Sequence, residues 1–274
     1  MDNRPIGVFD SGLGGLTGVR QLRRILPGED IVYFGDTGRV PYGSRSRETI
    51  IQYARQDINF LLSKNVKCIL AACGTVSSTY PPEEAAALPV PYTGVVYPAC
   101  QEAVRRTRSG RIGVIGTAAT IRSGSYVHVL RQLMPEAQVT AKACPLFVPL
   151  VENGYIDDGN PVTALVVEQL LGELKNQGID TLILGCTHYP LIKKAIGEFM
   201  GADVVLVDVA KVTADSLRRT LERRGLLNER SEGGTAHFYV SDTPQGFVTS
   251  AHLFMGDYSE GPVEQIAIEK FEEL

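Results

Sequence analysis

Short apolar runs alternate with amphipathic stretches along the whole chain, and this alternation constrains the fold more than any other feature. Between two of the runs, residues 49–64 repeat apolar side chains with the period of a helix. Nearly continuous apolar strands separated by helices indicate parallel sheets that are covered on both faces. The predicted strands are 6–9, 31–34, 68–72, 92–96, 112–115, 181–184, 204–207, 237–240 and 263–268. We therefore predict an α/β fold.

Two pairs of similar segments recur in the same order along the chain. Residues 6–12 resemble residues 112–118, and residues 70–75 resemble residues 182–188. Chance similarity between apolar strands would explain either pair alone, but the shared order at similar offsets favours a duplication. The repeat predicts two similar domains, each a mainly parallel sheet flanked by helices, with the active site in the cleft between them.

Proline-rich and polar connections indicate where the chain crosses between these domains. Prolines interrupt the helical pattern over residues 89–98, and a second crossing is predicted near residues 207–210. The first predicted domain is therefore discontinuous and comprises residues 1–97 with 210–274. The second predicted domain comprises residues 98–209.

Composition excludes several classes of function. The chain has 274 residues and a formal net charge of −4, so no excess of positive charge indicates binding to nucleic acid or to an anionic membrane. The N-terminal residues lack the apolar region of a signal peptide, and no apolar stretch approaches the ~18 residues of a membrane span. We expect a cytoplasmic protein with a small-molecule substrate and with neither nucleic acid nor membrane as a partner.

Five cysteines are present, and two of them have matching surroundings. Cys73 and Cys186 each follow a predicted strand and precede a predicted helix, whose N-terminus would lower a thiol's pKa. Either alone would be more typical of a buried core residue, but the matched contexts favour function. Cys68, Cys100 and Cys144 have no such setting and are predicted to pack in the interior. No Cys-x-x-Cys pair indicates zinc or thiol redox chemistry.

A glycine run after the first strand raises the alternative of dinucleotide binding. It begins at Gly12, but the third glycine of that fingerprint should stand where Thr17 is found. Asp36 does supply an acidic residue at about the right distance, so the motif is not wholly absent. A tight turn from strand to helix explains the glycines equally well. No P-loop sequence is present.

Two thiols facing each other across a cleft suit the inversion of a stereocentre. Inversion removes a proton from one face of a carbon and returns a proton to the other, so it needs one acid–base group on each face. A thiol and a thiolate can exchange these roles with the direction of reaction, and their pKa values lie near working pH. Asp10 is predicted to assist Cys73, and His188 to assist Cys186.

The chain resembles glutamate racemase, a family of the wider aspartate/glutamate racemase superfamily. The resemblance runs in order along nearly the whole chain, and the stretch Gly-Cys-Thr-His-Tyr-Pro at 185–190 is its most specific part. The other motifs that carry it are Asp10-Ser11-Gly-Leu-Gly-Gly-Leu, Gly35-Asp36-Thr37, Pro41-Tyr42-Gly43 and Cys144-Pro145-Leu146 leading to Glu152.

The resemblance implies interconversion of L- and D-glutamate without pyridoxal phosphate, metal or other cofactor, which supplies D-glutamate for peptidoglycan. It implies that Cys73 deprotonates D-glutamate and Cys186 deprotonates L-glutamate, and that the protein is a homodimer. The implied catalytic residues are Cys73, Cys186, Asp10, His188 and Glu152. The implied substrate-binding residues are Asp10, Ser11, Tyr42, Gly43, Gly74, Thr75, Thr117, Thr187 and His188.

One position departs from the family pattern. The family's first cysteine is followed by Asn-Thr, whereas this chain has Gly74 between Cys73 and Thr75. Loss of a hydrogen bond to a charged substrate group costs about 1.5–3 kcal/mol, so we expect weakened but not abolished catalysis. Restoring the side chain in Gly74→Asn should then tighten glutamate binding. Two alternatives stay open: a racemase for aspartate or another small acidic substrate, and a catalytically degenerate binding or regulatory protein.

Overall fold

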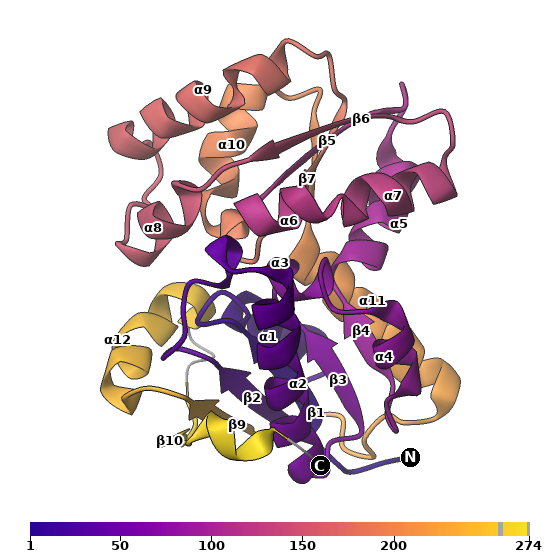
Figure 1. The fold of residues 1–274 in the computed structure, drawn as a ribbon, viewed down its shortest axis with the longest axis vertical. Helices are drawn as coiled ribbons and strands as arrows, with labels where there is room; N and C mark the ends of the chain where they lie inside the picture. Colours follow the sequence, from indigo (N-terminus) through magenta and orange to yellow (C-terminus); the bar gives the residue numbers. More distant parts are fainter. Residues whose placement is uncertain (257–259, 273–274) are drawn as a thin grey trace.

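Two parallel sheets form the framework of the protein, and the predicted α/β fold is confirmed (Figure 1). The computed structural model describes residues 1–256 and 260–272. The first sheet has the strand order β10-β9-β2-β1-β3-β4 and the second β6-β5-β7-β8. Their bounds are β1 Ile6–Asp10, β2 Ile31–Gly35, β3 Cys68–Ala71, β4 Tyr92–Gly94, β5 Arg111–Gly116, β6 Gln138–Ala143, β7 Thr181–Leu184, β8 Val205–Asp208, β9 Ala236–Val240 and β10 Val263–Gln265.

Helices connect these strands, and several begin at side chains that accept a hydrogen bond from the backbone of the first turn. Ser46, Asn160 and Asp208 cap the three longest helices, α2, α9 and α11, in this way. The bounds are α1 Leu16–Ile25, α2 Arg47–Ser63, α3 Gly74–Ser77, α4 Pro82–Ala87, α5 Val96–Arg106, α6 Ala118–Ser123, α7 Ser125–Leu133, α8 Phe147–Glu152, α9 Pro161–Lys175, α10 Lys193–Met200, α11 Val209–Arg224 and α12 Pro244–Met255, with 3₁₀ turns η1 Tyr42–Ser44, η2 Tyr189–Ile192 and η4 Ile268–Phe271.

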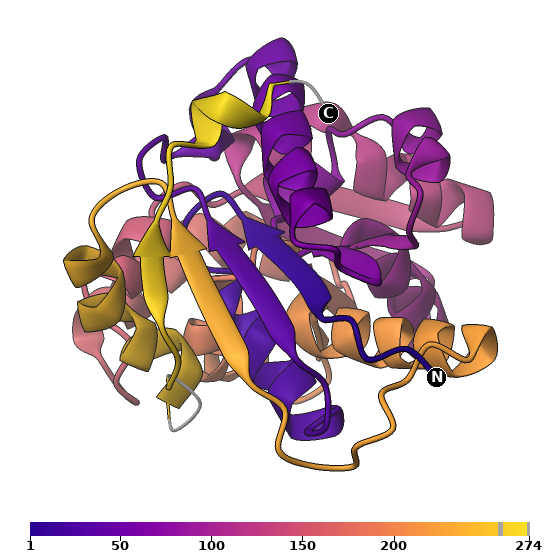
Figure 2. The ribbon, with the colours of Figure 1, turned by 90° about the horizontal axis from the view of Figure 1, so that it is seen from below.

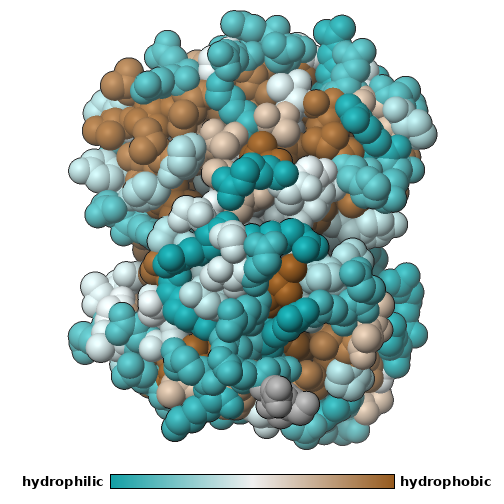
Figure 3. Space-filling model, in the orientation of Figure 1, coloured by the Kyte–Doolittle hydropathy of each residue, from teal (hydrophilic) through white to brown (hydrophobic). Residues whose placement is uncertain are grey.

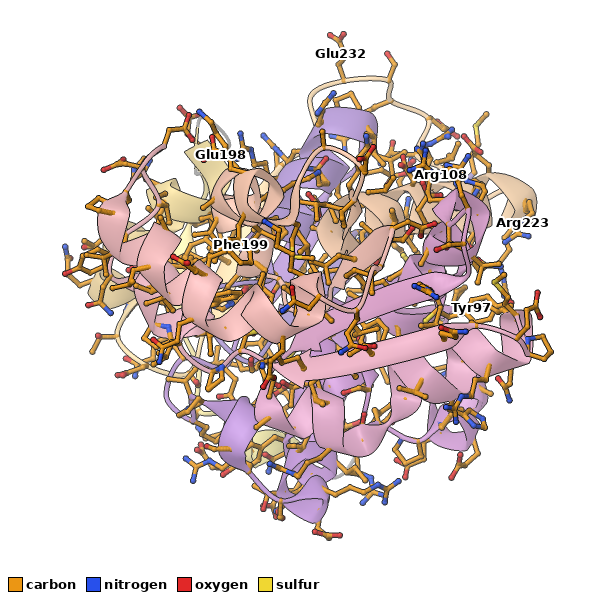
Figure 4. The ribbon with its side chains drawn as sticks, turned by 90° about the horizontal axis from the view of Figure 1, so that it is seen from above. Tyr97, Arg108, Glu198, Phe199, Arg223 and Glu232 are labelled. Carbon is orange, nitrogen blue, oxygen red and sulfur yellow. The ribbon has the colours of Figure 1, made fainter. Side chains whose placement is uncertain are left out.

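Each sheet is apolar on both faces because helices cover both. In β1, Ile6 and Val8 pack toward α1, α11 and α12, whereas Phe9 packs toward α2. Figure 2 shows the parallel strands of the first sheet from below with these helices around them. In the view of the second sheet from above, Tyr97 of α5 lies on one side of the sheet and Phe199 of α10 on the other (Figure 4).

The two sheets repeat one arrangement of strands. The order β2-β1-β3-β4 in the first corresponds to β6-β5-β7-β8 in the second, and every pairing is parallel. β1 and β5 are the segments whose sequences resemble each other, as are β3 and β7. Cys73 and Cys186 therefore follow equivalent strands. The boundaries of the two domains stay a prediction.

The two lobes meet along a narrow waist, which is visible in the space-filling view (Figure 3). Hydrogen bonds cross this seam from Thr17 Oγ1 to the Thr187 carbonyl (3.1 Å), between the hydroxyls of Thr75 and Thr117 (2.9 Å), and from Ser125 Oγ to the Ser78 carbonyl (2.5 Å). Within the described residues, no helix is both long and apolar enough to cross a membrane.

Candidate active site

The side chains predicted to do chemistry gather at the carboxyl ends of central strands. Asp10 ends β1, Cys73 lies two residues beyond β3, and Cys186 lies two residues beyond β7. The carboxyl ends of parallel strands are where ligands bind in α/β folds, because the turns there expose backbone N–H groups. The two thiols lie close enough for the charge of Cys186 to affect the proton affinity of Cys73.

Cys73 lies in a buried acidic environment. Its side chain is 3 % exposed, and Sγ donates a hydrogen bond to the hydroxyl of Ser11 at 3.3 Å. Burial, and then the charge of Asp10, raise the pKa of the Cys73 thiol to about 12. The first turn of α3 does lower this pKa through the backbone N–H of Val76, but burial and the charge of Asp10 outweigh it, so the expected net lowering is wrong for Cys73. In the resting protein Cys73 is therefore a neutral thiol, ready to donate a proton.

His188 connects Cys186 to the carboxylate of Glu152. His188 Nδ1 lies 3.7 Å from Cys186 Sγ, and His188 Nε2 lies 2.9 Å from Glu152 Oε1. The ring of Phe254 from α12 packs edge-on against the imidazole and holds its plane. Burial alone would lower the pKa of His188, but its hydrogen bonds with Cys186 and Glu152 reverse this and raise it to about 10. A cationic His188 places a positive charge beside the Cys186 sulfur.

Removing the Glu152 charge is expected to change the proton affinity of His188. In Glu152→Gln the pKa of His188 should fall from about 10, because a carboxylate that stabilises the imidazolium is replaced by a neutral amide. Turnover should drop by about tenfold, the effect expected when a hydrogen bond to a charged group is weakened. An NMR titration of the His188 ring protons checks the first expectation. An unchanged titration would contradict the connection of His188 to Glu152.

Three threonines predicted to bind substrate lie along the seam between the lobes. Thr75 and Thr117 face each other from opposite lobes, and Thr117 also accepts a hydrogen bond from the backbone N–H of Thr120 at 3.2 Å. Thr187 is 2 % exposed, and its carbonyl accepts the hydroxyl of Thr17. Thr75 lies two residues after Cys73, and Thr187 directly follows Cys186.

Asp10, which is predicted both to assist Cys73 and to bind substrate, is 1 % exposed. Its carboxylate accepts the backbone N–H of Gly12 at 3.1 Å. Burial raises the pKa of Asp10, while the charge of His188 and backbone N–H groups of the same turn oppose that change. The charge of His188 in the second lobe therefore acts on Asp10 in the first.

Tyr42 and Gly43 lie on the loop that follows β2, which spans residues 36–46. The side chain of Tyr42 is 1 % exposed and points into the core of the first lobe, where its hydroxyl meets Asp36 and Asp57. Its phenol does not face the cleft, so any contact with substrate comes from the backbone of this loop. Gly43 lies against Thr117, since a Cβ placed on it would be 2.9 Å from Thr117 Cβ.

Gly74 lies at the tightest point of the seam. A Cβ atom placed on Gly74 would overlap the carbonyl oxygen of Gly185, and it would also lie 3.3 Å from the carbonyl carbon of that residue. The neighbouring Cys186 Cα would be 3.7 Å away. The absence of a side chain at position 74 therefore allows the backbone directly after Cys73 to contact the backbone directly before Cys186.

Some contacts of the site could not be found from sequence motifs. Phe254, which contacts His188, comes from an apolar helix late in the chain, and Thr17 was noted only because it breaks a glycine pattern.

Cys68, Cys100 and Cys144 are buried in the interior. Nowhere in residues 1–256 and 260–272 do three or more His, Cys, Asp or Glu side chains form a group that could hold a metal ion.

Comparison with known protein families gives one match. Residues 17–217 match the family described as Asp/Glu/Hydantoin racemase. A protein of Geobacter metallireducens named glutamate racemase is 44 % identical over 266 residues, which cover 97 % of each chain.

Solved structures agree in fold over nearly the whole chain. Glutamate racemase from Francisella tularensis, in complex with D-glutamate, superposes with a TM-score of 0.91 at 36 % identity and covers 99 % of this chain and 100 % of that one. Glutamate racemase from Thermus thermophilus, in complex with β-chloro-D-alanine, has a TM-score of 0.88 at 43 % identity and covers 98 % and 100 %.

Proposed function

Because this chain belongs to the Asp/Glu/Hydantoin racemase family and is an amino-acid racemase, we propose that it interconverts L- and D-glutamate with Cys73 and Cys186 as its two acid–base groups. The observation that carries the proposal is the placement of two buried thiols after equivalent strands of a repeated fold. Each thiol has its own polar partner, Ser11 for Cys73 and His188 for Cys186.

In the proposed reaction each thiol acts on one face of the α-carbon. Starting from L-glutamate, the Cys186 thiolate takes the α-proton and the Cys73 thiol gives its proton to the opposite face. The products are D-glutamate, a Cys186 thiol and a Cys73 thiolate, and the reverse reaction restores the starting state. The high pKa of Cys73 suits its role as the acid in this direction, and cationic His188 suits Cys186 as the base.

The roles of the remaining residues are proposed from their positions. Asp10 and Glu152 would adjust the charge on the Cys73 and Cys186 sides respectively. Thr75, Thr117 and Thr187 would bind the substrate's polar groups, because Thr75 and Thr117 meet across the seam and Thr187 directly follows Cys186. We also propose that the product supplies peptidoglycan synthesis in the cytoplasm and that the protein acts as a homodimer. Figure 3 shows hydrophobic surface on the upper lobe, where Figure 1 places α9. Val162 and Leu165 of α9 are exposed apolar residues, which supports a protein contact on this helix.

Incubation with L-glutamate in deuterium oxide without added cofactor tests the proposal. We expect optical rotation to decay to zero while deuterium appears at the α-carbon of the D-glutamate formed. Exchange with aspartate but not with glutamate would overturn the substrate. Absence of exchange with every acidic amino acid would instead favour a binding or regulatory protein on the same scaffold.

A further inference from the structure

A buried cluster of charged and polar side chains lies directly behind the loop 36–46. Asp36 and Asp57 are both 0 % exposed, and Tyr42 is 1 % exposed. Arg39 joins them, with Nε donating to Asp36 Oδ2 at 2.6 Å and Nη2 donating to Asp57 Oδ1 at 3.3 Å. Burying two carboxylates and a guanidinium costs free energy unless each group is paired, so a buried cluster of this kind is more typical of a functional role than of stability.

The protonation of the cluster follows from its burial. Burial, and then the neighbouring Asp36 charge, raise the pKa of Asp57 well above its ordinary value. Asp36 pairs with the guanidinium of Arg39, and the hydroxyl of Tyr42 donates to Asp57 Oδ2 at 3.3 Å. The same hydroxyl also donates to Asp36. Every charged member of the cluster thus has a partner.

The cluster ties the loop to three separate elements. Arg39 Nη1 donates to Gln56 of α2, and its guanidinium stacks 3.9 Å from the centre of the Tyr53 ring of the same helix. Ser241, directly after β9, donates to Asp36 Oδ1 at 2.6 Å. The backbone N–H of Asp36 donates to the Asp10 carbonyl at 3.0 Å, which links the loop to the end of β1.

The far side of the same loop faces the site. Gly43 lies against Thr117 of the other lobe, and Val40 Cγ1 would be 2.9 Å from a Cβ placed on Gly12. Polar contacts of Arg39 and Asp36 therefore hold the loop on the side of the core. Its other side packs against Gly12 and Thr117. We propose that Arg39, Asp57 and Asp36 are positioning residues, which clamp the Tyr42 phenol and thereby set the position of the loop backbone that binds substrate. This inference rests on the proposed function and concerns binding, not proton transfer.

Substitutions that loosen the clamp test this role. Tyr42→Phe removes one oxygen atom, and Asp57→Ala removes the second partner of the phenol. We expect each to raise KM for L-glutamate by about tenfold, with kcat changed by less than about twofold. Asp57→Asn should restore KM to within about threefold of wild type, because an amide keeps the shape and neutrality of the protonated acid. Arg39→Lys is a milder variant that can replace Asp57→Ala if the latter does not fold.

A matched control lies at the opposite end of the same lobe. Lys67 and Glu29 form an equally buried ion pair at the amino ends of the strands, far from the loop. Lys67→Met should lower the denaturant midpoint while leaving KM unchanged, since it costs stability without moving the loop. Equal rises in KM for Lys67→Met and Tyr42→Phe would refute the clamp, as would an unchanged KM in folded Tyr42→Phe or a fall in kcat alone.

Binding measured without turnover separates this inference from the proposed function. The Kd for D-glutamate, measured by calorimetry on the same proteins, should follow the same order as KM. A wild-type protein that does not racemise glutamate refutes the proposed function, and the Kd series still decides the clamp. Normal wild-type turnover with identical Kd values across the series refutes the clamp alone.

Discussion

Cys73→Ala and Cys186→Ala are each expected to abolish effective racemisation, with a loss of roughly 10²–10⁴-fold, which is the usual contribution of a positioned acid–base group. Either substitution removes the group on one face of the α-carbon, so the remaining thiol can only return a proton to the face from which it came. Optical rotation of L- and of D-glutamate, followed to long times, measures the loss. Substantial racemisation by either variant would rule out the two-base mechanism.

Deuterium exchange in these variants also tests which thiol serves which enantiomer. Any residual exchange in Cys73→Ala should be confined to L-glutamate, and in Cys186→Ala to D-glutamate, without inversion. The opposite pairing would reverse the assigned roles. Cys68→Ala is the matched control, because Cys68 is a fully buried thiol that begins β3, the strand that leads to Cys73. It should keep wild-type exchange with both enantiomers.

The unequal surroundings of the thiols do not make one direction of the reaction faster at limiting substrate. The enantiomers have equal free energies in water, so kcat/KM must be the same in both directions at every pH. The raised pKa of Cys73 and the imidazolium beside Cys186 can therefore make kcat and KM differ between the two enantiomers, but only in proportion, so that kcat/KM stays equal. The sequence indicated that the two sides differ, but it located the difference in Gly74, not in the charges.

Strands buried on both faces were predictable, and an edge strand was not. β6 spans Gln138–Ala143 and was missed, because it reads Gln-Val-Thr-Ala-Lys-Ala and lies at the edge of its sheet with most residues half-exposed. The search for apolar runs found the edge strands β4, β8 and β10, but it misses an edge strand in which polar residues alternate with apolar ones. The internal repeat carried the missing information, since β6 occupies the place that β2 occupies in the first sheet.

Within the site, contacts between residues close in sequence were predictable, and contacts between distant segments were not. His188 lies two residues from Cys186, and the sequence already placed them together. The orientation of Tyr42 was not predictable, because its partners Asp36 and Asp57 come from a loop and from the buried face of α2. The sign of the Cys73 pKa shift was not predictable either, since the burial of the thiol and its distance from Asp10 depend on the pairing of β1 with β3 and on tertiary packing.

Gly74→Asn is expected to lower kcat/KM by roughly ten- to a hundredfold, opposite in sign to the expectation from sequence alone. The sequence predicted tighter binding from a restored hydrogen bond. The structure places the Gly185 carbonyl where the new Cβ would be, so the lobes would have to separate or the strand end before Cys186 would have to shift. Overpacking of this kind costs about 1–3 kcal/mol, and the same displacement would carry the new amide away from the substrate, so the hydrogen bond would not offset that cost.

Comparing Gly74→Ala with Gly74→Asn separates the steric effect from the hydrogen bond. Alanine adds the overlapping Cβ without an amide, so its kcat/KM should fall at least as far as that of Gly74→Asn. Gly172→Ala is the control, because a Cβ at Gly172 in α9 would meet no atom within 4 Å and should leave the kinetics unchanged. A Gly74→Asn variant faster than wild type would contradict the steric argument and would mean that the Gly74–Gly185 contact opens during turnover. The cost at position 74 therefore measures how closely the lobes must approach to bring both thiols to one carbon.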